Sequence, residues 1–151
     1  MRAARRPWRE AAILVVVTRL VFYGVAYAAT HMFAGGQGPV TEGFLDIWNR
    51  WDTRHFMTVA DLGWVDPDVL AARPAAFFPL YPLAIRALSA IGFAPILAGL
   101  LISTLSTWVA CAYLIKLADE EIGGGAGRRA ALYLLLFPTA VFLVAPYSEA
   151  L

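Results

Sequence analysis

One acidic residue and one histidine stand where an ordinary helix would carry only apolar groups. Asp52 and His55 fall in the amphipathic segment LDIWNRWDTRHFMTVADLGW, residues 45–64. If this segment is one helix, a projection at about 100° per residue places the pair on the apolar face. An ionisable pair on the apolar face of a helix beside a bilayer is costly unless a function requires it. The pattern therefore indicates that Asp52 is a catalytic carboxylate.

The same projection divides the rest of the segment into two faces. Trp48, Trp51, Val59 and Leu62 share the face of Asp52 and His55, and the other face takes Asp46, Asn49, Arg50, Thr53, Arg54 and Asp61. Two other interpretations stay open. Asp52 and His55 stand three residues apart and could satisfy each other, or the helix could turn the pair toward water above the lipid headgroups.

The composition is typical of a membrane protein. Of the 151 residues, 60% are hydrophobic and 15% are charged, and the mean hydropathy is +0.65, which is rare in a soluble domain. A net charge of +1 offers no basic surface for nucleic acid. Cys111, the one cysteine, lies in an apolar run, so neither a disulfide nor a cysteine metal site is expected. Arginine supplies all but one of the 12 cations, which hints at a GC-rich bacterial genome.

Three hydrophobic runs predict an all-α integral membrane domain over residues 1–151. The expected spans are residues 11–30, 94–118 and 130–146. The basic leader MRAARRPWRE predicts an N-terminus in the cytoplasm. An outer loop with amphipathic or interfacial helices then covers about residues 31–93, and a cytoplasmic loop covers about residues 119–129. A cleavable signal peptide begins in the same way, but the apolar runs downstream favour a retained span.

Several residues in and between the spans allow two interpretations each. Arg19, inside the first run, either snorkels along its helix or binds an acidic or phosphate group within the bundle. In AFFPLYPLAIRALSAIGF, residues 76–93, the prolines open an interfacial or re-entrant helix. Its Phe77, Phe78 and Tyr81 form an aromatic belt at the headgroups or, as a second interpretation, a groove for a lipid-linked substrate.

The third run carries a proline and ends in a polar block. Pro138 is expected to kink the helix, which delivers the block Pro146-Tyr147-Ser148-Glu149 to the face that carries Asp52. The glycines of residues 119–129 lack the lysine and the spacing of a nucleotide-binding loop, so they predict a flexible turn. Because the third span is followed by no loop, we expect the N-terminal part of a longer protein, with little or no activity by itself.

Three blocks in order resemble a known family. RWDTRHFMTVADLGW, AAFFPLYPLAIR and FPTAVFLVAPYSEAL together resemble the PIG-V family of GPI mannosyltransferases and its bacterial relatives, over residues 48–151. The resemblance implies a class C glycosyltransferase, which takes its sugar from a polyprenyl phosphate on the outer side of the membrane. In such families an acidic residue of the first outer loop is essential, and here that role falls on Asp52. Family members are several hundred residues long with many more spans, so much of the donor and acceptor site is expected outside these residues. Ordinary bacteria do not make GPI anchors, which leaves the acceptor open.

Glycosyl transfer supplies roles for the candidate residues. Asp52 would accept the proton of the acceptor hydroxyl while the sugar leaves a lipid phosphate. His55 could orient that carboxylate or donate to the phosphate, and a satisfied interface histidine is the alternative. The remaining predicted substrate-binding residues are Arg50, Arg54, Tyr147, Glu149 and Tyr81, although solvated surface arginines are the commoner outcome.

The predicted enzyme is therefore a membrane glycosyltransferase of the bacterial cytoplasmic membrane. Its expected partners are a polyprenyl-phosphate-linked sugar, a glycan or lipid acceptor and the bilayer, with no nucleic acid, no cofactor and no metal ion. The competing class is a non-enzymatic multi-span protein such as a transporter subunit, in which Arg19 and Glu149 line a polar path and Asp52 caps an interfacial helix.

Overall fold

The computed structural model describes residues 2–33, 45–64, 67 and 78–151, and every regular element among them is helical. The α-helices are α1 (Arg2–Phe33), α2 (Asp52–Leu62), α4 (Leu80–Ala90), α5 (Pro95–Glu121), α6 (Ala126–Leu136) and α7 (Val141–Val144). Short 3-10 helices are η1 (Asp46–Trp48), η3 (Pro138–Ala140) and η4 (Ser148–Ala150). The all-α expectation is confirmed.

Two helices are long and apolar enough to cross a membrane, over residues 6–30 of α1 and over the whole of α5. A third crossing exists only if α6 and the η3–α7 segment count as one span, and these two pieces meet at a bend of 73°. Phe137 is extended (φ −63°, ψ 143°), as a residue before proline usually is. The kink expected at Pro138 is therefore confirmed, and it is sharp enough to break the helix.

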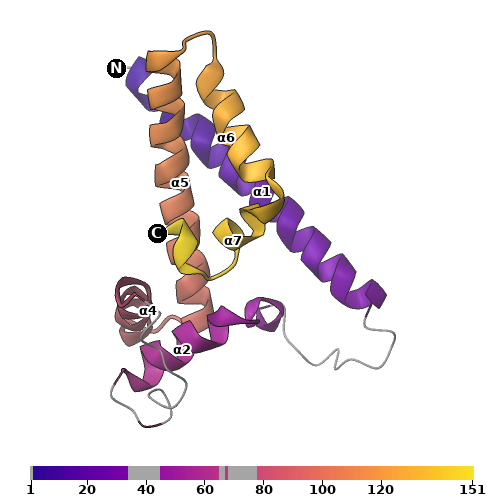
Figure 1. Ribbon diagram of the computed structural model, residues 1–151, viewed down its shortest axis with the longest axis vertical. Coiled ribbons are helices and arrows are strands. Elements are labelled where there is room, and N and C mark those ends of the chain that lie inside the picture. The colour runs from indigo at the N-terminus through magenta and orange to yellow at the C-terminus, as the bar shows by residue number, and fades with distance from the viewer. Residues whose placement is uncertain (1, 34–44, 65–66, 68–77) are drawn as a thin grey trace.

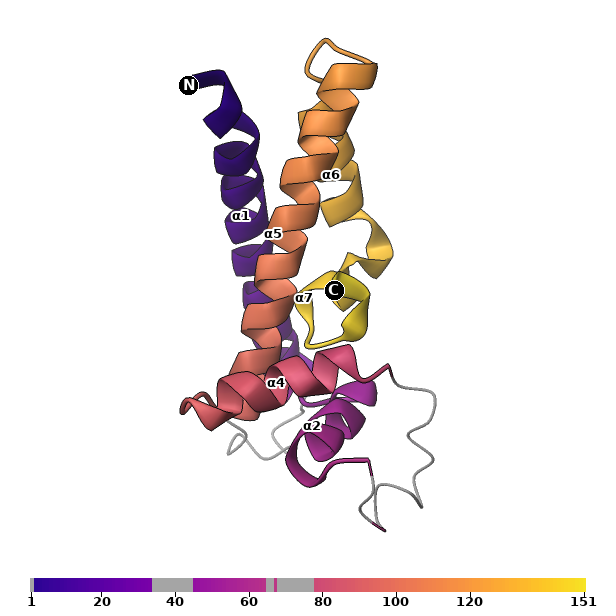
Figure 2. The same cartoon turned by 90° about the vertical axis from the view of Figure 1, so that its left-hand side faces the viewer.

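The bundle has two distinct ends. Figure 1 shows α5 and α6 running in opposite directions with α1 crossing them, and the N-terminus lies at the same end as the α5–α6 turn. Helices α2 and α4 lie at the opposite end, where α4 crosses the first turns of α5 (Figure 2). This arrangement separates the expected outer loop from the expected cytoplasmic loop. Which end faces the cytoplasm stays a prediction.

The turn between α5 and α6 depends on glycine. Gly123, Gly124 and Gly125 all have positive φ (74°, 59° and 73°), a conformation that other residues adopt only at a cost. The backbone N–H of Gly127 donates to the carboxylate of Asp119 at 2.9 Å, which satisfies one free amide at the start of α6. The glycines of this loop therefore form a turn, as expected.

Two apolar clusters hold the bundle, one toward each end. Where α1, α5 and α6 meet, the buried residues are Ala11, Leu14, Val15, Cys111, Ala112, Ile115, Ala131 and Leu135. Beside them the Trp8 and Trp108 rings pack edge to face at 5.4 Å, and the Trp108 indole N–H donates to the Trp8 carbonyl at 3.0 Å. Cys111, from the second apolar run, is buried in this cluster as a free thiol.

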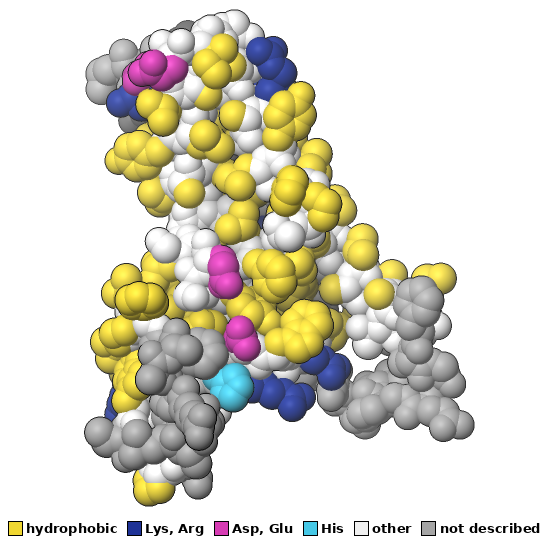
Figure 3. All heavy atoms as spheres, viewed as in Figure 1, with side chains coloured by type: hydrophobic (Ala, Val, Ile, Leu, Met, Phe, Trp, Pro, Cys, Tyr) yellow, Lys and Arg dark blue, Asp and Glu magenta, His cyan; other side chains and the backbone are white. Residues whose placement is uncertain are grey.

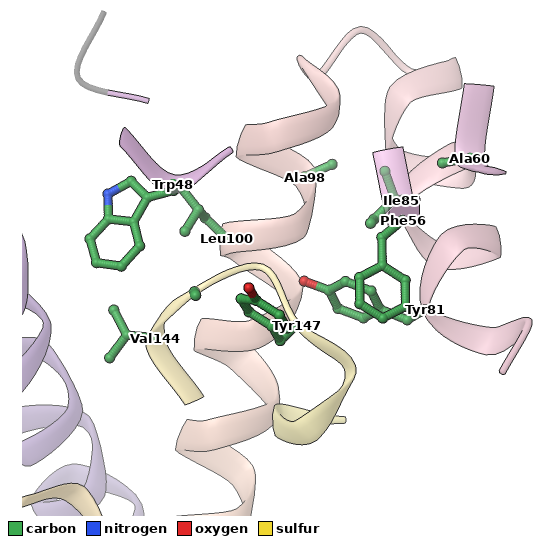
Figure 4. Packing of buried hydrophobic residues seen from close by; sticks show 10 residues of the cluster. Trp48, Phe56, Ala60, Tyr81, Ile85, Ala98, Leu100, Val144 and Tyr147 are labelled. Carbon is green, nitrogen blue, oxygen red and sulfur yellow. The ribbon is translucent and has the colours of Figure 1, made fainter. Parts of the chain in front are cut away.

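The second cluster joins α2, α4, α5 and the chain after α7 (Figure 4). Tyr81 is 1% exposed, and its hydroxyl lies 2.9 Å from both the Gly99 carbonyl and the Ser103 hydroxyl of α5. The expectation of a headgroup belt is wrong for Tyr81, because α4 lies across α5 with this side chain inward. Phe78 is exposed, and Phe77 lies outside the described residues.

The close contact of α6 with α5 at Gly127 can be tested by adding a methyl group, with Gly24 as the control. A Cβ at Gly127 would meet the backbone carbonyl of Ile115, whereas a Cβ at Gly24 would have nothing within 4 Å. Gly127→Ala should lower the free energy of unfolding by about 1–3 kcal/mol because two backbones must separate. Gly24→Ala should be neutral or stabilising by up to about 1 kcal/mol. Thermal unfolding in detergent measures both, and equal midpoints for the two variants would contradict the packing of α5 on α6.

The orientation in the membrane can be tested by cysteine labelling. In a Cys111→Ser background, single cysteines replace Thr58 in α2 and Glu121 at the end of α5, both of which are exposed. Because the cations of the leader predict a cytoplasmic N-terminus, an impermeant thiol reagent should label residue 58 in intact cells and residue 121 only after lysis. The reverse pattern would place α2 and Asp52 on the cytoplasmic side.

Candidate functional site

The segment that was expected to form one amphipathic helix is divided in two. Residues 46–48 form η1, and α2 begins only at Asp52. Between them the backbone of Trp51 has φ 46°, so the helical register does not continue across the break. Trp48 is 7% exposed and Trp51 is 75% exposed. The prediction that these two tryptophans share one apolar face is therefore wrong.

Within α2, the buried face also differs in part from the expected one, although Val59 is buried and Arg54 and Asp61 are exposed as predicted. Its buried residues are Thr53, Phe56, Val59 and Ala60, and these pack toward α4 and α5. Asp52, His55 and Leu62 are on the exposed side. Because Phe56 and Ala60 turn inward together with Val59, the helix is rotated from the projection. The pair does not lie on the buried face of α2. Whether it faces water above the lipid headgroups stays a prediction.

The start of α2 presents Asp52 on a strained turn. A bulky residue with positive φ is uncommon, and such backbone strain costs about 1–3 kcal/mol and often occurs at functional sites. Trp51 carries that conformation directly before Asp52. Asp52 then occupies the first helical turn, where the helix dipole and the free amides favour a negative charge. The result is an exposed carboxylate in the first turn of α2.

The chain after α7 returns to this helix end. The Tyr147 hydroxyl donates to the Arg50 carbonyl at 3.3 Å, although the two residues are 97 positions apart. Burial raises the pKa of the Tyr147 phenol, and the negative charge of Asp52 raises it further. The phenol is therefore neutral and able to donate at physiological pH. Tyr147 reaches the segment that carries Asp52, as the sequence predicts.

Other predicted site residues lie in different surroundings. Arg54 is exposed, and its Nε donates to the Asn49 carbonyl at 3.1 Å. Glu149 is exposed and borders a hollow of about 440 Å³ at the bend between α6 and α7, whose other walls are mainly aromatic and aliphatic. Figure 3 shows acidic, histidine and basic side chains following one another on a single face near α2. Tyr81 lies in the interior instead, where it joins α4 to α5.

Arg19 takes up neither of the positions proposed from the sequence. It is 5% exposed, and its guanidinium donates to the carbonyls of Val144 at 2.6 Å and Leu143 at 2.7 Å. It therefore neither reaches the surface by snorkelling nor holds an acidic group through these bonds. Within the described part of the chain, no three histidine, cysteine, aspartate or glutamate side chains form a group that could hold a metal ion.

An apolar groove lies directly beside the start of α2. It has a volume of about 320 Å³ and is lined by Phe22, Val25 and Ala26 of α1, by residues 47, 48, 50 and 51, and by Val141, Ala145 and Tyr147. Arg50 is the charged residue among its walls. Sequence reasoning missed this groove because its walls come from three distant segments, each of which reads as ordinary apolar packing. The groove, Arg50 and Asp52 together can hold an apolar chain with a polar or anionic head.

Comparisons with known proteins identify two curated relatives. The chain is 33% identical over 131 residues to GPI alpha-1,6-mannosyltransferase 2 of Mus musculus and 32% identical over 129 residues to the protein of that name from Homo sapiens. Each match covers 78% of this chain and 25% of the relative, so the chain spans about a quarter of their length. No family model matches, and no solved structure matches.

The link between Tyr147 and Asp52 predicts a pH effect. In the difference between the absorbance titrations of the protein and of Tyr147→Phe, the phenol should ionise above its ordinary value of 10.0. Because the charge of Asp52 is one cause of that rise, Asp52→Asn should move the midpoint back toward 10.0, whereas Asp61→Asn should not. A midpoint at or below 10.0, or one that is the same in the protein and in Asp52→Asn, would contradict the placement of Tyr147 beside α2.

Proposed function

We propose that this protein is a membrane glycosyltransferase of the mannosyltransferase type, with Asp52 as its catalytic base and a polyprenyl-phosphate-linked sugar as its donor. The carrying observation is the position of the exposed Asp52 carboxylate beside an apolar groove that includes Arg50. A lipid-linked sugar needs both features, since its tail must leave water while its sugar meets a base. The relatives support the sugar, because their names specify a mannosyltransferase.

The walls of the groove favour a lipid with an acceptor-rich head. Apart from Arg50 and the Tyr147 hydroxyl they are nearly all hydrocarbon or aromatic, which suits an isoprenoid chain. Beside Arg50, one buried donor in the wall of the groove lacks a hydrogen-bond partner among the described residues, the indole Nε1 of Trp48. A buried polar atom without a partner is costly, so a polar group that binds there stabilises the site. A phosphate ester would combine with the guanidinium by charge-assisted hydrogen bonds.

The proposed reaction is an inverting transfer. The Asp52 carboxylate takes the proton of the acceptor hydroxyl as that oxygen bonds to the anomeric carbon. The bond between this carbon and the phosphate oxygen breaks, and its electron pair leaves with the polyprenyl phosphate. Arg50, with Arg54 and His55 on the same exposed end of α2, would stabilise the negative charge on the leaving phosphate. This sequence of steps requires no metal ion and no cofactor.

The proposed setting follows from the two ends of the bundle. We place the N-terminus and the α5–α6 turn in the cytoplasm, and α2, α4 and the active site on the outer face of a bacterial cytoplasmic membrane. The acceptor is then a hydroxyl of a glycan or lipid on that face. Tyr147, which contacts the Arg50 carbonyl, would contribute to its binding from the start of α2, and Glu149 would contribute from the hollow at the α6–α7 bend.

A transporter subunit is less well supported. The broken helix at α6 and α7 is a feature that transporters share. The predicted polar path, however, needs Arg19 to face a channel, and its guanidinium is instead bound to backbone carbonyls. The charged residues of α2 are exposed, and α2 lies at one end of the bundle (Figure 1).

The proposed base can be tested by isosteric substitution. Asp52→Asn keeps the size of the side chain but removes the proton acceptor, so transfer should fall roughly a hundredfold or more. Asp52→Glu should also be impaired, because the carboxylate is displaced from the reacting oxygen. The measurement is mannose transfer from polyprenyl phosphate mannose by membranes that contain the protein expressed from its complete reading frame.

Asp61→Asn is the matched control. Asp61 is a second exposed carboxylate on α2, and its loss should leave more than half of the activity at equal protein levels in the membrane. Near-normal turnover by Asp52→Asn, or an equal loss in Asp61→Asn, would show that Asp52 is not the base and that α2 is a passive interfacial element.

A further inference from the structure

Arg19 is a buried cation that the proposed reaction does not use. It lies in the apolar part of α1, and its side chain is almost entirely enclosed. Besides the carbonyls of Leu143 and Val144, it donates to the hydroxyl of Thr107 in α5 at 3.2 Å. Charged side chains within membrane spans are expensive and commonly functional. The acceptors around Arg19 indicate what its function is.

The two carbonyls belong to the end of a helix that cannot satisfy them itself. α7 has only four residues, and the chain becomes extended at Ala145 (φ −63°, ψ 161°). The last carbonyls of a helix have no partner within it, and an apolar interior offers no water to replace one. Arginine suits this place because its planar fork donates to two acceptors at once and its charge is attracted to the negative end of the helix.

The residues that follow these carbonyls reach the proposed active site. Tyr147 comes three positions after Val144, and its hydroxyl contacts the Arg50 carbonyl beside Asp52. Glu149 follows two positions later. The position of α7 therefore determines where this block stands relative to the start of α2. Thr107 supports the same point from α5, because its hydroxyl lies 3.2 Å from the Leu143 carbonyl.

We infer that Arg19 is a positioning residue: it clamps the end of α7 to α1 and α5 and thereby holds Tyr147 and Glu149 in register with Asp52. This inference rests on the proposed function for its kinetic consequence, but the clamp itself is a structural property. Arg19 does not bind the donor phosphate, since its guanidinium is enclosed and already donates to Leu143, Val144 and Thr107.

Two substitutions show whether Arg19 acts through its planar guanidinium or through its positive charge alone. Arg19→Met keeps much of the apolar stem but leaves the Val144 carbonyl without its donor and the Leu143 carbonyl with Thr107 alone. Arg19→Lys keeps the charge but loses the planar fork. For mannose transfer by the protein from its complete reading frame, kcat should fall tenfold or more in Arg19→Met and less in Arg19→Lys. KM for the lipid donor should stay within twofold in both. Arg86→Met, at an exposed arginine of α4, is the control and should change neither constant.

The clamp can be measured without any reaction. In a Cys111→Ser background, a cysteine replaces Ala145, which is 5% exposed and follows α7 directly. N-ethylmaleimide should react with it at least tenfold faster when Arg19→Met is added, because the end of α7 is released. A cysteine at Ala131, buried among α1, α5 and α6, should stay protected in both backgrounds, which shows that the bundle remains folded.

Each contrary outcome overturns the inference in a different way. A rise in KM for the donor with unchanged kcat would make Arg19 a binding residue for the lipid phosphate. If the cysteines at residues 131 and 145 both become exposed in Arg19→Met, Arg19 is a general stabiliser of the fold. Unchanged labelling at residue 145 would show that Arg19 does not hold the end of α7. If the unsubstituted protein transfers no sugar, the proposed function fails while the labelling still decides whether the clamp exists.

Discussion

A helix that breaks inside an apolar layer leaves backbone carbonyls without partners, and the rest of this structure depends on how they are satisfied. The break at Pro138 turns α7 away from α6 by 73°. Arg19 reaches from α1 to the carbonyls of Leu143 and Val144. From α5, the Thr107 hydroxyl lies 3.2 Å from the Leu143 carbonyl. These bonds connect three helices at one level, so none of the three can shift without exposing an unpaired polar group.

Two tyrosine hydroxyls extend this connection to the end that carries the proposed site. Tyr81 joins α4 to α5, and Tyr147 joins the chain after α7 to Arg50. Burial raises the pKa of both phenols, so both remain neutral donors. With 11 residues α2 would be marginal as an isolated helix. It is held because Phe56 packs edge to face on both tyrosine rings, with centroids at 5.1 and 6.4 Å.

This support leaves one side of α2 free for chemistry. Asp52 is exposed on an element whose opposite side is buried, and the apolar groove begins immediately before it at Arg50 and Trp51. A boundary between hydrocarbon and water is where the head of a lipid-linked substrate must lie. The strained backbone of Trp51 separates the residues that line the groove from the helix that presents the carboxylate.

By itself the sequence determined what depends on neighbouring residues: an all-helical membrane protein, the approximate long helices, the glycine turn and the break at Pro138. These follow from run length, apolar content and the backbone limits of glycine and proline. Asp52 could be singled out as an unusual acid, but the face on which it lies could not, because the conformation of Trp51 interrupts the helical register. Only the tertiary structure decided the burial of Tyr81, the groove and the partners of Arg19. The physical reason is separation along the chain: Arg19 and Val144 are 125 positions apart, and no local pattern encodes which distant carbonyl a buried guanidinium will meet.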